Sequence, residues 1–175
     1  MLKLSLKDEE YPFDGFDHER KIARAFVLRE GKIALHHIHR DDMFGNENYL
    51  ETPGGGVDEG ETFAEAVKRE CLEETGYDIE LLAEIGEVKD AYNLIRRANI
   101  NRFFLAVATE QHPKHFVSSG DLYIIDTRFY TFDEAIALYE KQSDRGVSGL
   151  VKRRELPMLL EAKRIAIELG LENVK

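Results

Sequence analysis

The sequence has a single cysteine, no linker-like segment and no long apolar run. Its only cysteine, Cys71, excludes an intrachain disulfide and a thiolate metal cluster, so any metal must bind oxygen or nitrogen ligands. No apolar run approaches the roughly 20 residues that a membrane-spanning helix needs, and the first residues, MLKLSLKDEE, lack the apolar core of a signal peptide. We therefore expect a cytoplasmic protein with no membrane partner. No repeat and no linker rich in serine, glycine or proline divides the chain, which predicts one domain over 1–175.

Positive charge is also in deficit. The chain has 24 lysines and arginines against 34 aspartates and glutamates, a formal net charge of −10 at pH 7. Such a chain repels a nucleic acid polymer. It can still bind small phosphorylated molecules, because a bound metal ion reverses the local electrostatics of an acidic site. The apolar fraction of 43% and the charged fraction of 33% are typical of a globular protein.

The expected elements give an α/β or α+β fold, with helices packed on a mixed sheet. Residues 1–20 are expected to be irregular with one edge strand, and residues 41–48, 54–56 and 111–121 to be loops. Strands are expected over 21–30, 32–39, 49–52, 79–88, 99–109 and 122–129, with 79–88 and 99–109 antiparallel. Helices are expected over 62–75, 131–142 and 157–169. In the last helix, the spacing indicates one apolar stripe formed by Leu159, Leu160, Ile165 and Leu169.

Three glutamates stand out in the expected helix 62–75. Glu70, Glu73 and Glu74 fall at i, i+3 and i+4 and therefore share a face, where like charges repel. A hard divalent cation such as Mg²⁺ would offset this repulsion, because it prefers carboxylate oxygens. An acidic face that is simply solvated is the alternative, and the spacing alone does not decide between them.

The residues before this helix form a longer pattern with it. Gly55, five residues, Glu61, seven residues and then RECLEETGY over 69–77 reproduce the signature of the Nudix hydrolases, which this segment resembles over 55–77. Two aliphatic positions of the signature are occupied by Cys71 and Tyr77. Glycines before a helix also offer free backbone N–H groups and close approach to phosphate.

This resemblance implies an α/β/α sandwich and metal-dependent hydrolysis of a nucleoside diphosphate linked to another group. By the family pattern, Glu73 and Glu74 bind Mg²⁺ or Mn²⁺ with the carbonyl of Gly55, while Glu70 is a further ligand or the base. Arg69 and Glu61 orient these carboxylates. In some members the base lies in a later loop, and the candidates here are Glu110, Asp121 and Asp126.

Substrate contacts are less specific in the sequence. Tyr49 can stack on a nucleobase or pack on the sheet, and Arg40, Arg96, Arg97 and Arg102 can bind phosphate or form surface ion pairs. Nucleoside triphosphates, dinucleoside polyphosphates and nucleotide sugars remain open as substrates. A catalytically inactive nucleotide-sensing module is the alternative function, and a homodimer is a possible assembly. His36, His37 and His39 fit a strand edge better than a zinc site, because no third ligand is evident.

Overall fold

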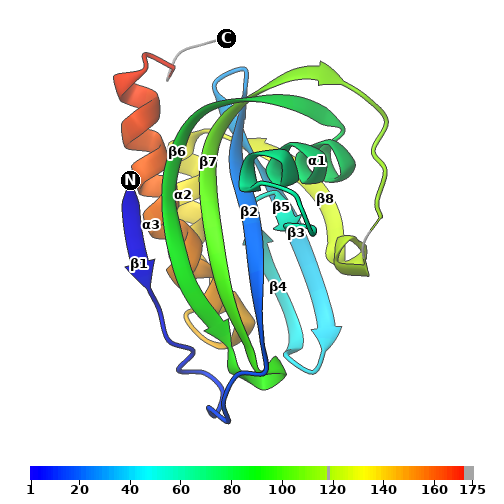
Figure 1. The fold of residues 1–175 in the computed structure, drawn as a ribbon. Coiled ribbons are helices and arrows are strands. Elements are labelled where there is room, and N and C mark those ends of the chain that lie inside the picture. The colour runs from blue at the N-terminus through cyan, green and yellow to red at the C-terminus, as the bar shows by residue number, and fades with distance from the viewer. Residues whose placement is uncertain (118, 172–175) are drawn as a thin grey trace.

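A mixed sheet between two layers of helices forms the fold. The computed structural model describes residues 1–117 and 119–171. The strands run in the order β1-β6-β7-β2-β3-β4, with β5 paired to β2 and β8 paired to β3. Helix α1 covers one face, and α2 and α3 cover the other (Figure 1). The expected three-layer arrangement on a mixed sheet is confirmed.

The bounds of the elements follow. The strands are β1 Leu2–Ser5, β2 His18–Arg29, β3 Lys32–Asp42, β4 Gly45–Glu51, β5 Gly54–Gly56, β6 Tyr77–Tyr92, β7 Arg97–Gln111 and β8 Ile124–Tyr130. The helices are α1 Phe63–Thr75, α2 Phe132–Lys141 and α3 Gly146–Glu168, with short 3-10 turns at η1 Asn93–Ile95 and η2 Ser119–Tyr123. Over the described part of the chain, no helix has the length and apolar character needed to cross a membrane.

Strands β2 and β3 separate soon after the turn that joins them. They pair only at Leu28 with Ile33 and at Arg29 with Lys32. Below this point β2 pairs in parallel with β7 and antiparallel with β5, while β3 pairs with β4 and β8. The separation opens a cleft whose walls come from β2 and β3.

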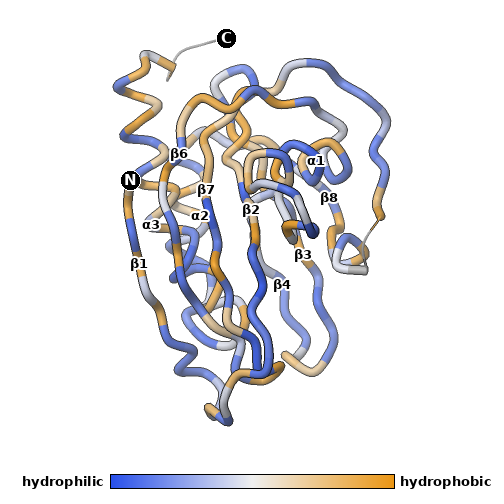
Figure 2. The backbone as a smooth tube through the Cα atoms, viewed as in Figure 1, coloured by the Kyte–Doolittle hydropathy of each residue, from blue (hydrophilic) through white to orange (hydrophobic). Residues whose placement is uncertain are grey.

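Two apolar cores hold the layers together. Beneath α2 and α3 the core contains large side chains such as Phe26, Phe103 and Tyr139. Beneath α1 the sheet presents small residues of β2, which let Val67 and Cys71 approach closely. The polar start of β2 and its apolar second half are visible in Figure 2 and match the change from exposed to buried residues along the strand.

Helix α1 begins and ends as the sequence predicts. Thr62 and Glu65 form a capping box, and Gly76 ends the helix with φ 77° in the left-handed region. Thr131 and Glu134 form the predicted second capping box at the start of α2. These signals are local, which explains why they can be read from the sequence.

The expected loop over 41–48 is wrong, because β3 and β4 form a hairpin there. The strands extend to Asp42 and from Gly45, and Gly45 has φ 107° at the turn. Asp42 accepts hydrogen bonds from the backbone N–H of Phe44 (2.9 Å) and from Nε of Arg40 (2.6 Å), which stabilise the turn. Residues 54–56 are likewise a short strand, β5, rather than a loop, because they pair with β2.

Helix α3 begins eleven residues before the expected start at Pro157, at Gly146. Its first backbone N–H groups donate to carboxylates far away in the sequence: Gly146 to Glu10 and Ser148 to Glu47, both at 2.8 Å. Pro157 lies inside the helix.

The expected apolar stripe on α3 is partly wrong. Leu159 is fully buried, but Leu160 and Leu169 are 50% and 51% exposed. Leu159 is in the core together with Met158, Ala162 and Ala166, and Ile165 packs against this core as the stripe predicts.

Candidate active site

The cleft between β2 and β3 is lined by residues from most elements of the fold. Its lining includes the carboxylates Glu70, Glu74 and Asp121, the arginines Arg20, Arg24, Arg40 and Arg97, and the tyrosines Tyr49, Tyr92 and Tyr123. These three acidic residues come from α1 and η2, a fourth, Glu51, comes from β4, and the basic residues come from β2, β3 and β7. The cleft therefore places a negative cluster and several positive groups in one cavity.

The acidic cluster is buried. Glu70, Glu74 and Asp121 are 7%, 5% and 3% exposed, and one carboxylate oxygen of each lies within 4.8 Å of the others. Burial raises the pKa of Glu70 to about 7, and the neighbouring Glu74 carboxylate adds to this while the hydrogen bond from Arg69 opposes it. Oxygen donors this close together repel one another and fit a hard divalent ion such as Mg²⁺ or Mn²⁺.

Arg69 connects the acidic residues to β5. Its Nε and Nη2 donate to the two carboxylate oxygens of Glu61, both at 2.9 Å, and its Nη1 donates to Glu70 at 2.8 Å. Nη2 also donates to the carbonyl of Gly56 at 2.9 Å. Glu73 is less buried, with an oxygen 3.6 Å from Nη1 of Arg69. The bidentate contact with Glu61 fixes the plane of the guanidinium beside Glu70.

The glycines of β5 are needed for contact with α1. A Cβ at Gly55 would lie 2.5 Å from the carboxyl carbon of Glu70. The backbone N–H of Gly54 donates to Glu74 at 2.8 Å, and Gly54 has φ 140°. Only residues without a side chain let the strand lie against the acidic face of the helix.

His36 lines the cleft, and the sequence analysis did not distinguish it from His37 and His39. Its Nε2 lies 2.9 Å from a carboxylate oxygen of Glu74, its Nδ1 lies 2.9 Å from the hydroxyl of Thr127, and it is 2% exposed. The available signal was strand alternation, since Ala34 packs in the core beneath α1 and His36 follows two residues later. His37 and His39 instead contact Tyr130 (2.6 Å) and Asn48 (2.9 Å).

The remaining predicted residues divide between the cleft and the surface. Tyr49, Arg40 and Arg97 line the cleft, and so does Asp121. Among the other base candidates, Glu110 is an exposed residue near Asp78 and His112, and Asp126 pairs with Arg128 at 2.8 Å. Neither of them lines the cleft. Arg96 and Arg102 form ion pairs on the surface, with Asp14 and Asp17 and with Glu87 respectively.

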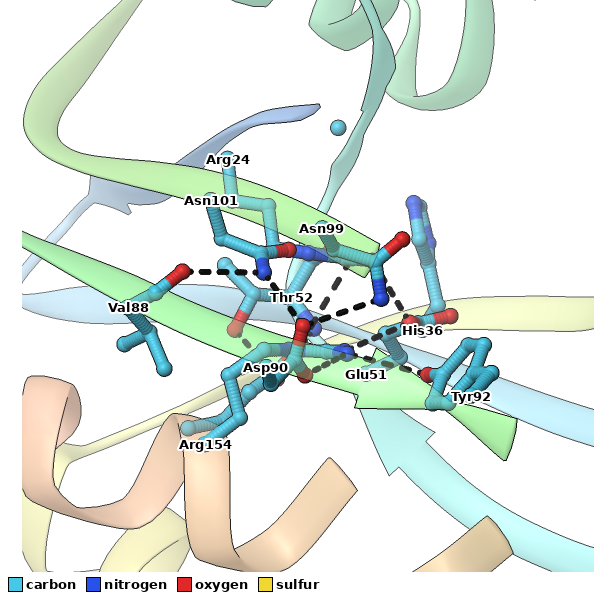
Figure 3. A network of polar contacts seen from close by, with 12 residues as sticks. Arg24, His36, Glu51, Thr52, Val88, Asp90, Tyr92, Asn99, Asn101 and Arg154 are labelled. Carbon is cyan, nitrogen blue, oxygen red and sulfur yellow. Dashed lines mark hydrogen bonds and ion pairs between the residues drawn. The ribbon is translucent and has the colours of Figure 1, made fainter. Parts of the chain in front are cut away.

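A network of buried charges lies behind the cleft wall (Figure 3). Its centre is Arg154, which is fully buried and donates to Glu51 and Glu155, both at 2.9 Å, and to the hydroxyl of Tyr92 at 3.0 Å. It also lies 3.4 Å from Asp90. Sequence reasoning did not identify this network, because its members come from β4, β6 and α3 and have no common spacing.

Comparison with known proteins identifies relatives of both sequence and fold. The family model described as the NUDIX domain matches residues 18–148. A Bacillus subtilis (strain 168) protein named "Putative 8-oxo-dGTP diphosphatase" is 58% identical over 77 residues, which cover 41% of this chain and 52% of that protein. The chain therefore matches about half the length of this curated relative.

Solved structures with low sequence identity share the fold. A NUDIX hydrolase from Nitrosomonas europaea has a TM-score of 0.62 at 18% identity, covering 84% of this chain and 89% of that one. The MutT protein from Methanosarcina mazei Go1 has a TM-score of 0.60 at 15% identity, and the match covers 87% of this chain and 97% of that one. At this identity the likeness shows a common architecture.

Proposed function

Because the chain belongs to the NUDIX family, over residues 18–148, we propose that it is a divalent-metal-dependent hydrolase of nucleoside diphosphate derivatives. The observation that supports this most is the buried acidic cluster of Glu70, Glu74 and Asp121 beside β5. A cleft that holds four carboxylates and four arginines suits a substrate whose phosphates are bound partly through metal and partly through guanidinium groups. The name of the B. subtilis relative makes nucleoside triphosphates the first class to test.

The acidic residues have distinct roles in this proposal. Glu70 and Glu74 would hold Mg²⁺ or Mn²⁺, and Asp121, whose carboxylate lies within 4.8 Å of theirs, would be a further ligand. Glu73 and the carbonyl of Gly55 are the additional ligands that the family pattern implies. The metal, when bound, neutralises the diphosphate oxygens and lowers the pKa of bound water. Glu70 or Asp121 accepts the proton of the attacking water.

Arg69 and Glu61 are positioning residues. Arg69 contacts Glu61 through two hydrogen bonds and Glu70 through one, so it sets where the Glu70 carboxylate lies. Tyr49, Arg40 and Arg97 line the same cleft as the acidic cluster, and in this proposal they contact the nucleotide. The guanidinium of Arg40 is held over the rings of Phe44 and Tyr123, at 4.6 and 4.8 Å from their centroids.

The test is a substrate screen with the purified chain. Nucleoside triphosphates, dinucleoside polyphosphates and nucleotide sugars are incubated with Mg²⁺ or Mn²⁺, and phosphate-containing products are measured. We expect hydrolysis that stops with EDTA and returns with metal, and a loss of at least about 10²-fold in kcat for Glu70→Gln. Glu59→Gln, an exposed glutamate before α1, is the matched control and should keep full activity.

Two results would contradict the proposal. Full activity in EDTA would exclude metal dependence. Tight binding of nucleotides without turnover of any of them would instead favour the inactive sensing module.

The setting of the protein is also part of the proposal. We place it in the cytoplasm, acting on small nucleotides and not on nucleic acid polymers, and as a homodimer. Light scattering tests the last point, since a monomer has a mass of 20.1 kDa.

A further inference from the structure

Arg97 is a cleft arginine that forms no ion pair with any described residue of the protein. It is half-buried at the start of β7 and lines the same cavity as Glu70 and Glu74. Within residues 1–117 and 119–171, none of the ion pairs includes Arg97, although most other arginines have one. A partly desolvated charge without a counter-ion is costly, so its retention calls for an explanation.

Its guanidinium is held in place from one side only. Nε donates to the side-chain oxygen of Asn99 at 2.7 Å, and the group lies over the ring of Tyr92, 5.2 Å from the centroid. Asn99 in turn donates to Asp90 at 3.0 Å, and the hydroxyl of Tyr92 accepts from Arg154 at 3.0 Å. Figure 3 shows Asn99, Asp90, Tyr92 and Arg154 in this network. The network therefore fixes Arg97 through Nε and the ring face, and no protein acceptor for its Nη groups is found among the described residues.

Two of the other three cleft arginines form ion pairs with carboxylates, and one does not. Arg24 pairs with Glu51 at 2.8 Å, and Arg40 with Asp42 at 2.6 Å. Arg20, like Arg97, has no ion pair with any described residue. Its side chain lies over β5, where a Cβ at Gly56 would be 2.8 Å from Nη2. Desolvation lowers the pKa of Arg97, and the positive charge of Arg20 adds to the effect. Arg20 and Arg97 thus form a positive region in the cleft that also holds the acidic cluster.

The strand register separates Arg97 from β5. Along β2, Ala23 pairs with Gly55 and His18 pairs with Arg97. These β2 positions are five residues apart, which corresponds to about 16 Å along the strand. The backbone of Arg97 therefore lies farther along the cleft than the backbone of Gly55, although both residues line the same cavity.

We infer that Arg97, assisted by Arg20, binds an anionic phosphate group of the substrate other than the diphosphate held at the acidic cluster. This inference rests on the proposed function. A fixed guanidinium with two free Nη groups matches the two oxygens of a phosphate. The extra phosphate lies either in a longer polyphosphate chain or on the group attached to the diphosphate. A nucleotide sugar with a neutral sugar lacks it and is a poor substrate.

The test compares pairs of substrates that differ in one phosphate-bearing group. Comparing a nucleoside triphosphate with the matching nucleoside diphosphate sugar tests for a phosphate in a longer polyphosphate. Comparing NADPH with NADH tests for a phosphate on the group attached to the diphosphate. We expect the more highly charged member of at least one pair to have the higher kcat/KM. Arg97→Gln should reduce this preference about tenfold or more, mainly through KM. Arg97→Lys keeps the positive charge but lacks the two Nη groups, so it should restore only part of the preference.

Controls separate this inference from the proposed function. Arg102→Gln removes an arginine outside the cleft and should leave the preference unchanged. Gly56→Ala, whose methyl group displaces Arg20, should weaken it. An equal loss on both members of each pair, or no preference in the unmodified chain, would overturn the inference while hydrolysis itself remained established.

A binding measurement covers the remaining outcome. The unmodified chain could hydrolyse no substrate, or Arg97→Gln could fail to fold. In either case, the affinity for inorganic triphosphate without metal is compared between the unmodified chain and Arg97→Lys, and this comparison tests whether Arg97 binds phosphate. We expect weaker binding by the variant, and equal affinities would refute the role of Arg97.

Discussion

Replacing Gly55 with alanine should remove activity and leave the fold intact. The new Cβ would lie 2.5 Å from the carboxyl carbon of Glu70 and 2.6 and 2.7 Å from its two oxygens. Ordinary contacts begin at 3.4 Å, so the carboxylate must move by about 1 Å. Gly55 is not among the residues with positive φ, so alanine adds no backbone strain.

The size of the effect follows from this displacement. A misplacement of 1 Å at a reacting group can cost about 10²-fold in rate, and we expect kcat/KM of Gly55→Ala to fall by about that factor. The displaced atoms are the end of a flexible side chain, so the free energy of unfolding should change by only about 1 kcal/mol. Steady-state kinetics and urea unfolding measure the two quantities independently.

Gly60→Ala is the matched control for this experiment. Gly60 has φ 80°, and nothing lies within 4 Å of its added Cβ. It should therefore lose about 1 kcal/mol of stability through backbone strain and keep its kcat. If Gly55→Ala folded normally and kept more than a third of the kcat/KM, the assignment of Glu70 to the reaction would be refuted.

Three further variants test the parts of the structure around the site. Arg154→Met leaves the carboxylates around it without their buried cation and should destabilise the protein by about 3–5 kcal/mol in urea unfolding; a loss under about 1 kcal/mol would show that the network is not coupled. His36→Asn removes one of the partners that hold Glu74. In a metal titration, the variant should have about tenfold lower activity or should need about tenfold more metal for half-maximal activity. An unchanged titration would make His36 only a packing residue. Glu10→Gln weakens the cap on α3: the backbone N–H of Gly146 holds the pKa of Glu10 below its ordinary 4.5, so the stabilisation is present above that pH and is lost as the pH falls through the lowered pKa. Unfolding curves of this variant and the unmodified chain should differ at pH 7 and converge in acid, and a constant difference would contradict the assignment.

The sequence allowed the prediction of the parts of the site that lie close together in the chain. Arg69, Glu70, Glu73 and Glu74 occupy one helix, whose start at Thr62 depends on the local capping box. Helix periodicity then fixes which of them share a face. The family pattern implied that the carbonyl of Gly55 acts together with the glutamates of the helix, and the structure shows that Gly55 lies against Glu70.

The parts that could not be predicted depend on pairing between distant segments. His36 reaches Glu74 only because the side chains of β3 on this face of the sheet point toward α1, and this packing has no local signature. The start of α3 depends on Glu10 and Glu47, which are more than 100 residues earlier in the chain. Pro157 was a reasonable local signal for a helix start, but packing of the preceding residues against the sheet outweighs it.

The single cysteine has a practical consequence for following motion in this protein. Cys71 is fully buried in the core between α1 and the sheet, where burial raises the pKa of its thiol well above the ordinary value. A thiol reagent can reach it only when α1 separates from the sheet, and no second thiol competes for the reagent. The labelling rate therefore reports how often the helix that carries Glu70, Glu73 and Glu74 opens, in the unmodified chain and without an engineered probe.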